Sequence, residues 1–147
     1  MLKIYLDNCC YGRLFDDLTQ TKIYLEAKAV ESILLLYEKR ELAIYTSSVA
    51  VFEFSNITDL SKKRQIEDLY NALSLENIEY SDSIKNRAIE LREHNIKDMD
   101  SLHIAFSESA EVDYFITTDK FLWNVAKRVI LETKIISPID FITEVEE

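Results

Sequence analysis

Four acidic side chains stand where a parallel α/β sheet would bring them to one edge. Asp7 ends an apolar segment that is typical of a buried strand, and Asp119 lies two residues past another segment of this kind. Glu53 lies about one and a half turns into a helix that follows a strand, and Asp100 lies in the first turn of a later helix. Because ligands of open parallel sheets bind outside the carboxyl ends of the strands, these carboxylates are candidates for one shared site.

Each acid alone has an ordinary structural explanation, since an Asp at a strand end or in a first helical turn is usually a cap or a partner of the helix dipole. Glu53 is harder to explain, because Val49, Ala50 and Ile57 share its helical face and would place it in or beside a buried stripe. Several carboxylates on one edge also repel one another unless a cation neutralises them. Oxygen ligands suit Mg²⁺ or Mn²⁺, and substrate phosphates normally complete the coordination of these ions. This predicts hydrolysis of a phosphodiester by a metal-bound water, which requires neither a histidine base nor a covalent nucleophile.

Alternating strands and helices are expected to position these acids. The patterns predict strands within residues 3–7, 41–46, 78–81, 113–117 and 133–136. They predict helices within residues 21–40, 49–57, 61–73, 81–93, 99–109 and 119–128, and the expected N-caps are Ser47 or Ser48, Ser81 or Asp82, and Asp98. The alternation predicts one α/β domain over residues 1–147, in which helices cover both faces of a parallel sheet.

The composition argues against several classes of function. With 17 basic and 27 acidic residues the net charge is −10, which leaves only a local role for electrostatic binding to nucleic acid. Gly12 is the only glycine, which excludes the glycine-rich loops of P-loop enzymes, dinucleotide-binding domains and kinases. Cys9 and Cys10 are adjacent and offer no disulfide framework. The sequence has no apolar run of membrane-spanning length and no signal-peptide pattern, so we expect a cytoplasmic protein with no membrane partner.

Four segments carry a resemblance to a known family: LDNCCYGRLFDD at 6–17, TSSVAVFEF at 46–54, DSLHIAFSESAEVDYFITTD at 100–119 and KIISPIDFI at 134–142. Together they resemble a PIN-domain protein, of the bacterial kind similar to VapC toxins, over essentially the whole chain. The resemblance implies a three-layer α/β/α fold around a parallel sheet and a metal-dependent ribonuclease site. It implies that Asp7, Glu53, Asp100 and Asp119 are the catalytic residues and the ligands of Mg²⁺ or Mn²⁺.

The resemblance also implies supporting residues and partners. The small hydroxyl residue near the fourth acid falls on Thr117, with Thr118 beside it. Asn8 follows the first acid and could hold a metal-bound water. A homodimer with a small antitoxin protein bound is implied as well, so a second chain could cover part of the apolar helix segment SILLLYEK.

The spacing around the third acid leaves two questions open: which aspartate is that acid, and what His103 does. Asp98 competes with Asp100 for that position, but residues two apart on a helix face different ways, and we assign Asp98 to the cap. His103 lies three residues after Asp100 on the same helical face. It is either a supporting partner or proton shuttle of the site, or a histidine that is simply packed near it.

Basic side chains near the acids are the candidates for substrate binding. Arg13, which is expected in the loop after the first strand, would contact the scissile phosphate, or alternatively pair with Asp16 or Asp17 on the surface. Lys120 lies on the helix that Asp119 opens and, with the basic residues further along it, could guide an RNA backbone.

Two classes of function follow from these residues. One is a metal-dependent endoribonuclease that acts on RNA, as the toxin held in check by a cognate antitoxin. The other is a catalytically weak or inactive relative that keeps the fold for protein binding, but such a relative has no need of acids that repel. A phosphate-accepting receiver domain fits poorly, because Asp16 and Asp17 stand too far past Asp7 and Lys134 lies at the start of its strand.

Overall fold

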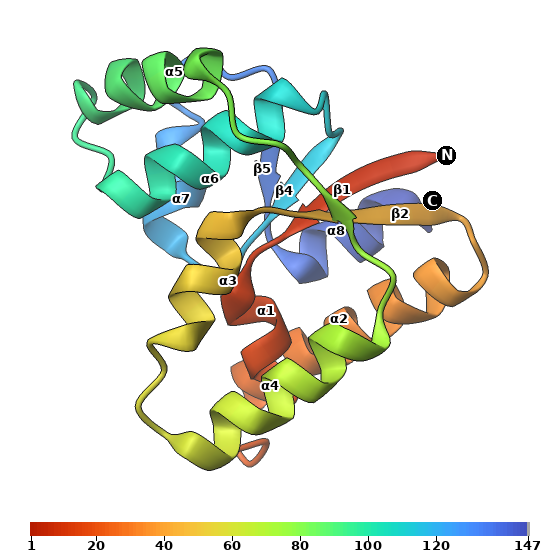
Figure 1. The fold of residues 1–147 in the computed structure, drawn as a ribbon. Coiled ribbons are helices and arrows are strands. Elements are labelled where there is room, and N and C mark those ends of the chain that lie inside the picture. The colour runs from red at the N-terminus through yellow and green to blue at the C-terminus, as the bar shows by residue number, and fades with distance from the viewer. Residues whose placement is uncertain (147) are drawn as a thin grey trace.

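The computed structural model describes residues 1–146 and contains a sheet in which every strand pair is parallel. Its strands are β1 (Leu2–Leu6), β2 (Leu42–Thr46), β3 (Glu76–Asn77), β4 (Tyr114–Ile116) and β5 (Lys134–Ile136). Their spatial order is β3-β2-β1-β4-β5, with β1 in the centre (Figure 1). The chain thus builds the sheet outward from β1 to β3 and then returns to the other side of β1 for β4 and β5.

The central strand shows why the sheet needs cover on both faces. Side chains alternate along a strand, so Ile4 and Leu6 of β1 enter one core while Tyr5 enters the other, and all three are buried. On the Tyr5 face, Phe115 of β4 stacks on the Tyr5 ring with the centroids 5.4 Å apart. A strand buried on both faces has a continuously apolar sequence, which is the pattern that predicted β1.

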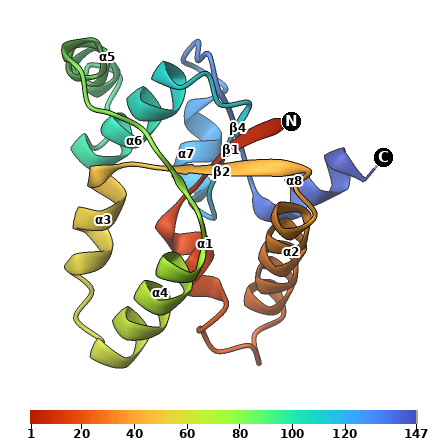
Figure 2. The ribbon, with the colours of Figure 1, turned by 45° about the vertical axis from the view of Figure 1, so that its right-hand side comes forward.

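Helices form a layer on each side of the sheet (Figure 2). One layer contains α1 (Asn8–Arg13), α2 (Thr21–Glu38), α4 (Leu60–Ala72) and α8 (Pro138–Val145), and the other contains α5 (Asp82–Arg92), α6 (Asp98–Ser109) and α7 (Lys120–Val125). Helix α3 (Ser48–Ser55) follows the carboxyl end of β2 and gives Val49 to one core and Phe54 to the other. The three-layer α/β/α fold implied by the sequence motifs is confirmed.

Two short helices, α1 and α8, differ from the sequence expectations. The α1 sequence NCCYGR contains weak helix formers, and the helix begins at the Asp7 N-cap, so Arg13 ends a helix and does not lie in a loop. Helix α8 was not predicted, although its sequence has the pattern of a helix start: Ser137 is the N-cap and Pro138 opens the first turn.

Element boundaries also shift in places. Strand β3 forms at Glu76–Asn77 and not at 78–81, and α7 ends at Val125, before the predicted end at 128. The N-cap of α6 is Lys97, which makes no side-chain cap bond, so the prediction of Asp98 as the cap is wrong; Asp98 lies in the first turn instead. Ser47 and Ser81 are confirmed as N-caps of α3 and α5.

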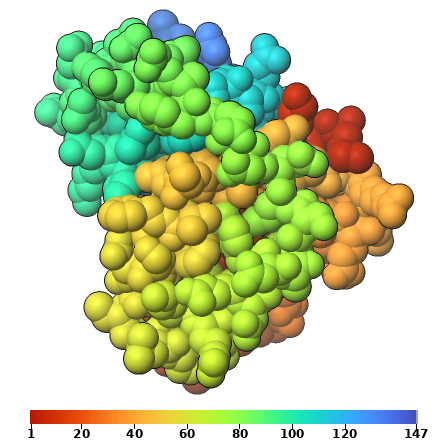
Figure 3. Space-filling view, viewed as in Figure 1, coloured from red at the N-terminus to blue at the C-terminus, as the bar shows by residue number. Residues whose placement is uncertain are grey.

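Helices α3 and α4 form the lower part of the surface in the space-filling view of Figure 3, where Figure 1 places α1 from the same viewpoint. Cys10, Tyr11 and Gly12 of α1 are buried. Within residues 1–146, no helix combines the length and apolar character needed to cross a membrane.

Candidate active site

The sheet reverses its direction of growth between β1 and β4, and the acids gather at the carboxyl ends of these two strands. Asp7 follows β1, and its backbone N–H donates to the Ile116 carbonyl of β4 at 2.9 Å. Asp119 follows β4 and is the N-cap of α7. Loops diverge where the strand order reverses and leave a crevice there, which is the usual place for a ligand in an open parallel sheet.

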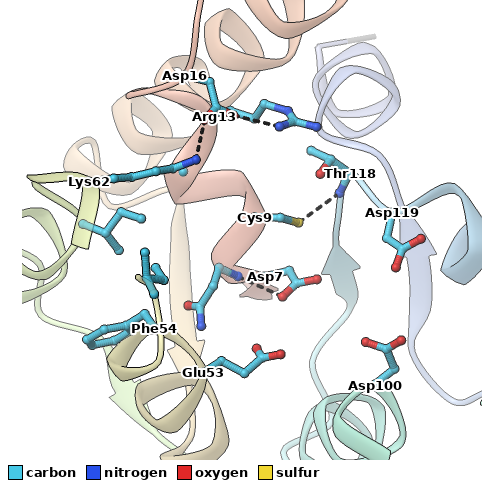
Figure 4. A pocket seen from close by; sticks show the side chains of 14 residues that line it. Asp7, Cys9, Arg13, Asp16, Glu53, Phe54, Lys62, Asp100, Thr118 and Asp119 are labelled. Atoms are coloured by element: carbon cyan, nitrogen blue, oxygen red, sulfur yellow. Dashed lines mark hydrogen bonds and ion pairs between the residues drawn. The ribbon is translucent and has the colours of Figure 1, made fainter. Parts of the chain in front are cut away.

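Glu53 and Asp100 reach the same crevice from helices. All four acids line one cavity of about 420 Å³, and Figure 4 shows their carboxylates turned toward a common space. Asp7 comes from the end of β1, Glu53 from α3, Asp100 from the first turn of α6 and Asp119 from the start of α7. The structure therefore brings together the four acids that the sequence predicted.

Thr117 links the acids at the two strand ends. Its hydroxyl donates to Asp7 Oδ2 at 2.8 Å and accepts from the Asp119 backbone N–H at 3.1 Å. The carbonyl of Thr117 accepts from the Trp123 indole at 2.7 Å, which fixes the turn between β4 and α7. The Asp7 carboxylate is thus held in one orientation, with its other oxygen accepting from the Asn8 N–H.

Glu53 has a buried partner on α6. The ring of His103 is 1% exposed, and its Nε2 lies 2.5 Å from Glu53 Oε1, while the Glu53 side chain is 31% exposed toward the cavity. His103 therefore contacts the site directly, which favours a supporting role over simple packing.

Burial and mutual repulsion raise the proton affinity of the site. The pKa of Asp100 is raised to about 6, first by burial and then by the negative charges of Asp7 and Asp119. Burial also raises the pKa of Asp7, although the nearby imidazole of His103 opposes it. For His103, burial lowers the pKa, but the hydrogen bond to Glu53 and the charge of Asp7 outweigh burial, so the pKa lies above its ordinary value.

The donor chemistry of this cluster fits a divalent cation. Four carboxylates supply only hard oxygen ligands, and burial together with the charges of Asp7 and Asp119 disfavours the ionised form of Asp100 by raising its pKa to about 6. Mg²⁺ and Mn²⁺ suit such a site and would relieve the repulsion. Asp7, Glu53, Asp100 and Asp119 are the residues that would hold the ion.

We expect the metal-free protein to lose stability as the pH rises from about 4 to about 7. The pKa values of Asp100, Asp7 and His103 are all raised in the folded state, so the folded state binds more protons than the unfolded state in this range. A raised pKa contributes stability that is fully present below the unfolded-state pKa and is lost as the pH rises through the folded-state pKa, which is about 6 for Asp100. Urea unfolding in EDTA at several pH values measures this loss.

A substitution at Asp100 tests whether this pH-dependent loss of stability comes from the acidic site. Asp100→Asn should raise the free energy of unfolding of the metal-free protein at about pH 7.5 by about 1 kcal/mol, a value reduced for the partial exposure of this carboxylate. Asp98→Asn removes the same charge from an exposed position two residues away and should change little. Stability that increases over this pH range in EDTA would contradict the prediction.

The structure also locates three residues that the sequence predicted to support the acids or bind substrate, which are Asn8, Thr118 and Lys120. Asn8 donates its amide to the Ala50 carbonyl of α3 at 2.7 Å, so this side chain connects α1 to α3, and its Oδ1 has no hydrogen-bond partner within residues 1–146. Thr118 lines the cavity, and its N–H donates to Cys9 Sγ at 3.4 Å. Lys120 is exposed on the first turn of α7, next to Asp119, but it does not line the cavity.

Arg13 lines the same cavity but is bound to two acids. Its Nε donates to Glu26 Oε1 at 3.0 Å and its Nη1 donates to Asp16 Oδ2 at 2.8 Å. Asp16 also pairs with Lys62 from α4, as Figure 4 shows. The pairing with Asp16, one of the two alternatives for Arg13, is therefore present, and a contact to phosphate stays a prediction.

Sequence reasoning did not assign several residues to this site. Cys9 and Lys62 line the cavity, and Tyr5 and Ser47 lie behind Glu53. Lys62 packs beside Gly12, where an added Cβ would lie 3.4 Å from Lys62 Cε, in van der Waals contact. A tyrosine in a strand buried on both faces was the one available signal, since its hydroxyl requires a buried partner.

No protein-family model matches the sequence, and no curated protein matches it significantly. The structure is similar to VapBC2 from Rickettsia felis bound to a DNA fragment from their promoter, over 92% of this chain and 98% of that chain, with a TM-score of 0.59 and 14% identity. It is equally similar to PAE2754 from Pyrobaculum aerophilum, over 99% of this chain and 97% of that chain, with a TM-score of 0.59 and 14% identity. Both neighbours are PIN-domain proteins, so the expected PIN-like fold is confirmed.

Proposed function

We propose that this chain is a metal-dependent endoribonuclease that hydrolyses phosphodiester bonds of RNA in the cytoplasm. The observation that carries the proposal is the convergence of Asp7, Glu53, Asp100 and Asp119 on one cavity where the strand order reverses. Burial and the neighbouring carboxylates both raise the pKa of Asp100, so a bound cation would favour its ionised form. The fold shared with PIN-domain proteins supports the same assignment.

A divalent cation bound here would lower the pKa of the attacking water and stabilise the leaving oxygen. The chain's own contribution is orientation. Thr117 holds Asp7 and the backbone of Asp119 through one hydroxyl, and His103 holds Glu53. Lys120, exposed beside Asp119 on the first turn of α7, would attract the RNA backbone, and the net charge of −10 makes such local contacts necessary.

We further propose that the protein is a homodimeric toxin with a cognate antitoxin. The structural neighbour VapBC2 is a complex of toxin and antitoxin with DNA, which supports an antitoxin partner for a chain of the same fold. The acidic surface also suits a basic partner protein, because opposite charges speed association and favour the correct partner.

Cleavage of a mixed pool of structured RNAs tests the nuclease. The purified protein should cut RNA in Mg²⁺ or Mn²⁺, should not cut in EDTA, and should regain activity when excess Mn²⁺ is restored. A protein that neither cuts RNA nor binds Mn²⁺ in a calorimeter would instead be a PIN-fold module for protein binding. Mn²⁺ binding without cleavage would indicate a narrow substrate that the pool lacks.

A further inference from the structure

Glu53 is the outer end of a continuous chain of hydrogen-bonded side chains. His103 Nε2 lies 2.5 Å from Glu53 Oε1, His103 Nδ1 lies 2.7 Å from the Tyr5 hydroxyl, and the Tyr5 hydroxyl lies 2.6 Å from Ser47 Oγ. Tyr5, Ser47 and His103 are each no more than 1% exposed. The chain therefore runs from the cavity into the protein interior.

The chemistry of the partners gives this chain one direction. A carboxylate only accepts hydrogen bonds, so His103 Nε2 carries the proton that it donates to Glu53. When the imidazole is neutral, which is its state above the raised pKa of His103, Nδ1 has a lone pair that accepts from the Tyr5 hydroxyl. The Tyr5 oxygen accepts in turn from the Ser47 hydroxyl, and Ser47 Oγ accepts from the Ala50 N–H as the N-cap of α3.

This arrangement argues against two other roles for His103, which are binding the metal ion and transferring a proton to solvent. Atoms of Asp7, Glu53 and His103 lie within 4.8 Å of one another, a spacing that would allow all three to bind one ion. A protonated Nε2 has no lone pair for a metal, however, and Nδ1 is turned toward Tyr5. Proton transfer to solvent is also unsuited, because the chain ends at Ser47, which is buried.

We propose that His103, Tyr5 and Ser47 are positioning residues that hold one oxygen of Glu53 and leave its other oxygen to the cation. This inference rests on the proposed cation site. The hydrogen-bonded chain joins three elements that position three of the acids: Tyr5 lies on β1, which Asp7 follows, Ser47 caps the helix of Glu53, and His103 follows Asp100 on α6. Side chains behind a metal site commonly fix its ligands in this way.

Calorimetric titration of the full-length protein with Mn²⁺ tests the role of His103. His103→Leu removes the donor to Glu53 and should weaken Mn²⁺ affinity by about 10-fold to about 100-fold. His103→Gln places an amide N–H near the position of Nε2 and should retain most of the affinity. Thermal unfolding of each protein establishes that it is folded, and equal loss in the Gln and Leu proteins would overturn a role that depends on the hydrogen bond.

The tyrosine gives a second test, because it touches none of the acids in the cavity. Tyr5→Phe should weaken Mn²⁺ binding by about 10-fold, since the tautomer of His103 is then no longer fixed. Tyr114→Phe is the matched control, because its hydroxyl bonds Glu144 on the opposite side of the sheet from Tyr5 and should leave Mn²⁺ binding unchanged.

Spectroscopy can determine which nitrogen of His103 carries the proton and whether His103 binds the metal ion. Nitrogen-15 spectra of the metal-free protein should show His103 protonated at Nε2, and electron spin echo spectra of bound Mn²⁺ should show no coupling to an imidazole nitrogen. Such a coupling would make His103 a ligand and overturn the proposal. Failure of the wild-type protein to bind Mn²⁺ would overturn the cation site and the proposal together, whereas binding that survives His103→Leu would overturn this proposal alone.

Discussion

RNA cleavage by the Asp7→Asn protein is expected to be about a thousandfold slower than cleavage by the wild type, which corresponds to about 4 kcal/mol of lost transition-state stabilisation. Asp7 stands at the end of the central strand and lines the cavity with the other three acids. Both of its oxygens accept hydrogen bonds, one from Thr117 and one from the Asn8 N–H. An amide removes the negative charge and also turns one acceptor atom into a donor, so the ligand would lose both its charge and its orientation.

Single-turnover cleavage of one RNA in saturating Mn²⁺ measures this effect independently of product release. Asp98→Asn is the matched control, because Asp98 is exposed, its carboxylate pairs with Arg92 at 3.4 Å, and it does not line the cavity. The control should cleave at the wild-type rate. Cleavage by Asp7→Asn within about tenfold of the wild type would remove Asp7 from the proposed site.

The sheet was predictable because its strands carry strong local signals. The segments that form β1 and β4 are apolar, β-branched or aromatic and are buried on both faces. Their sequences therefore favour a strand over other secondary structure. Strand β3 has only Glu76 and Asn77, both exposed, and it pairs along β2 at the edge of the sheet. Its position depends on that pairing and not on its own sequence, which is why the prediction placed it too late in the chain.

The four acids were predictable from topology, whereas their supports were not. A parallel sheet brings strand ends together whatever the details of packing, so Asp7 and Asp119 could be assigned to one edge. The hydrogen bonds of His103 depend on the distance between α6, β1 and α3, and no spacing in the sequence reports that distance. Helical periodicity therefore indicated the face on which His103 lies but not its partners.

The pairing of Arg13 leads to the second large effect, which concerns stability. Arg13→Met should lower the free energy of unfolding by about 3 kcal/mol, because it leaves the carboxylate of Glu26, which is 1% exposed, without its bond to the guanidinium. Denaturant unfolding measures the loss. Lys28→Met is a matched control on the same helix as Glu26, since it breaks the pair with Glu31, in which both side chains are 52% exposed, and should cost about 0.5 kcal/mol or less.

A double variant separates this structural role from substrate binding. Arg13→Met combined with Glu26→Met replaces the buried pair by apolar side chains of similar length and should recover stability to within about 1 kcal/mol of the wild type. Because the Nε and Nη1 groups of Arg13 are already bound to acids, we expect the KM for RNA of this double variant to stay near the wild-type value. A stable double variant with a KM raised by about tenfold would instead show that Arg13 contacts the substrate, as the sequence suggested, since each factor of ten corresponds to about 1.4 kcal/mol of binding.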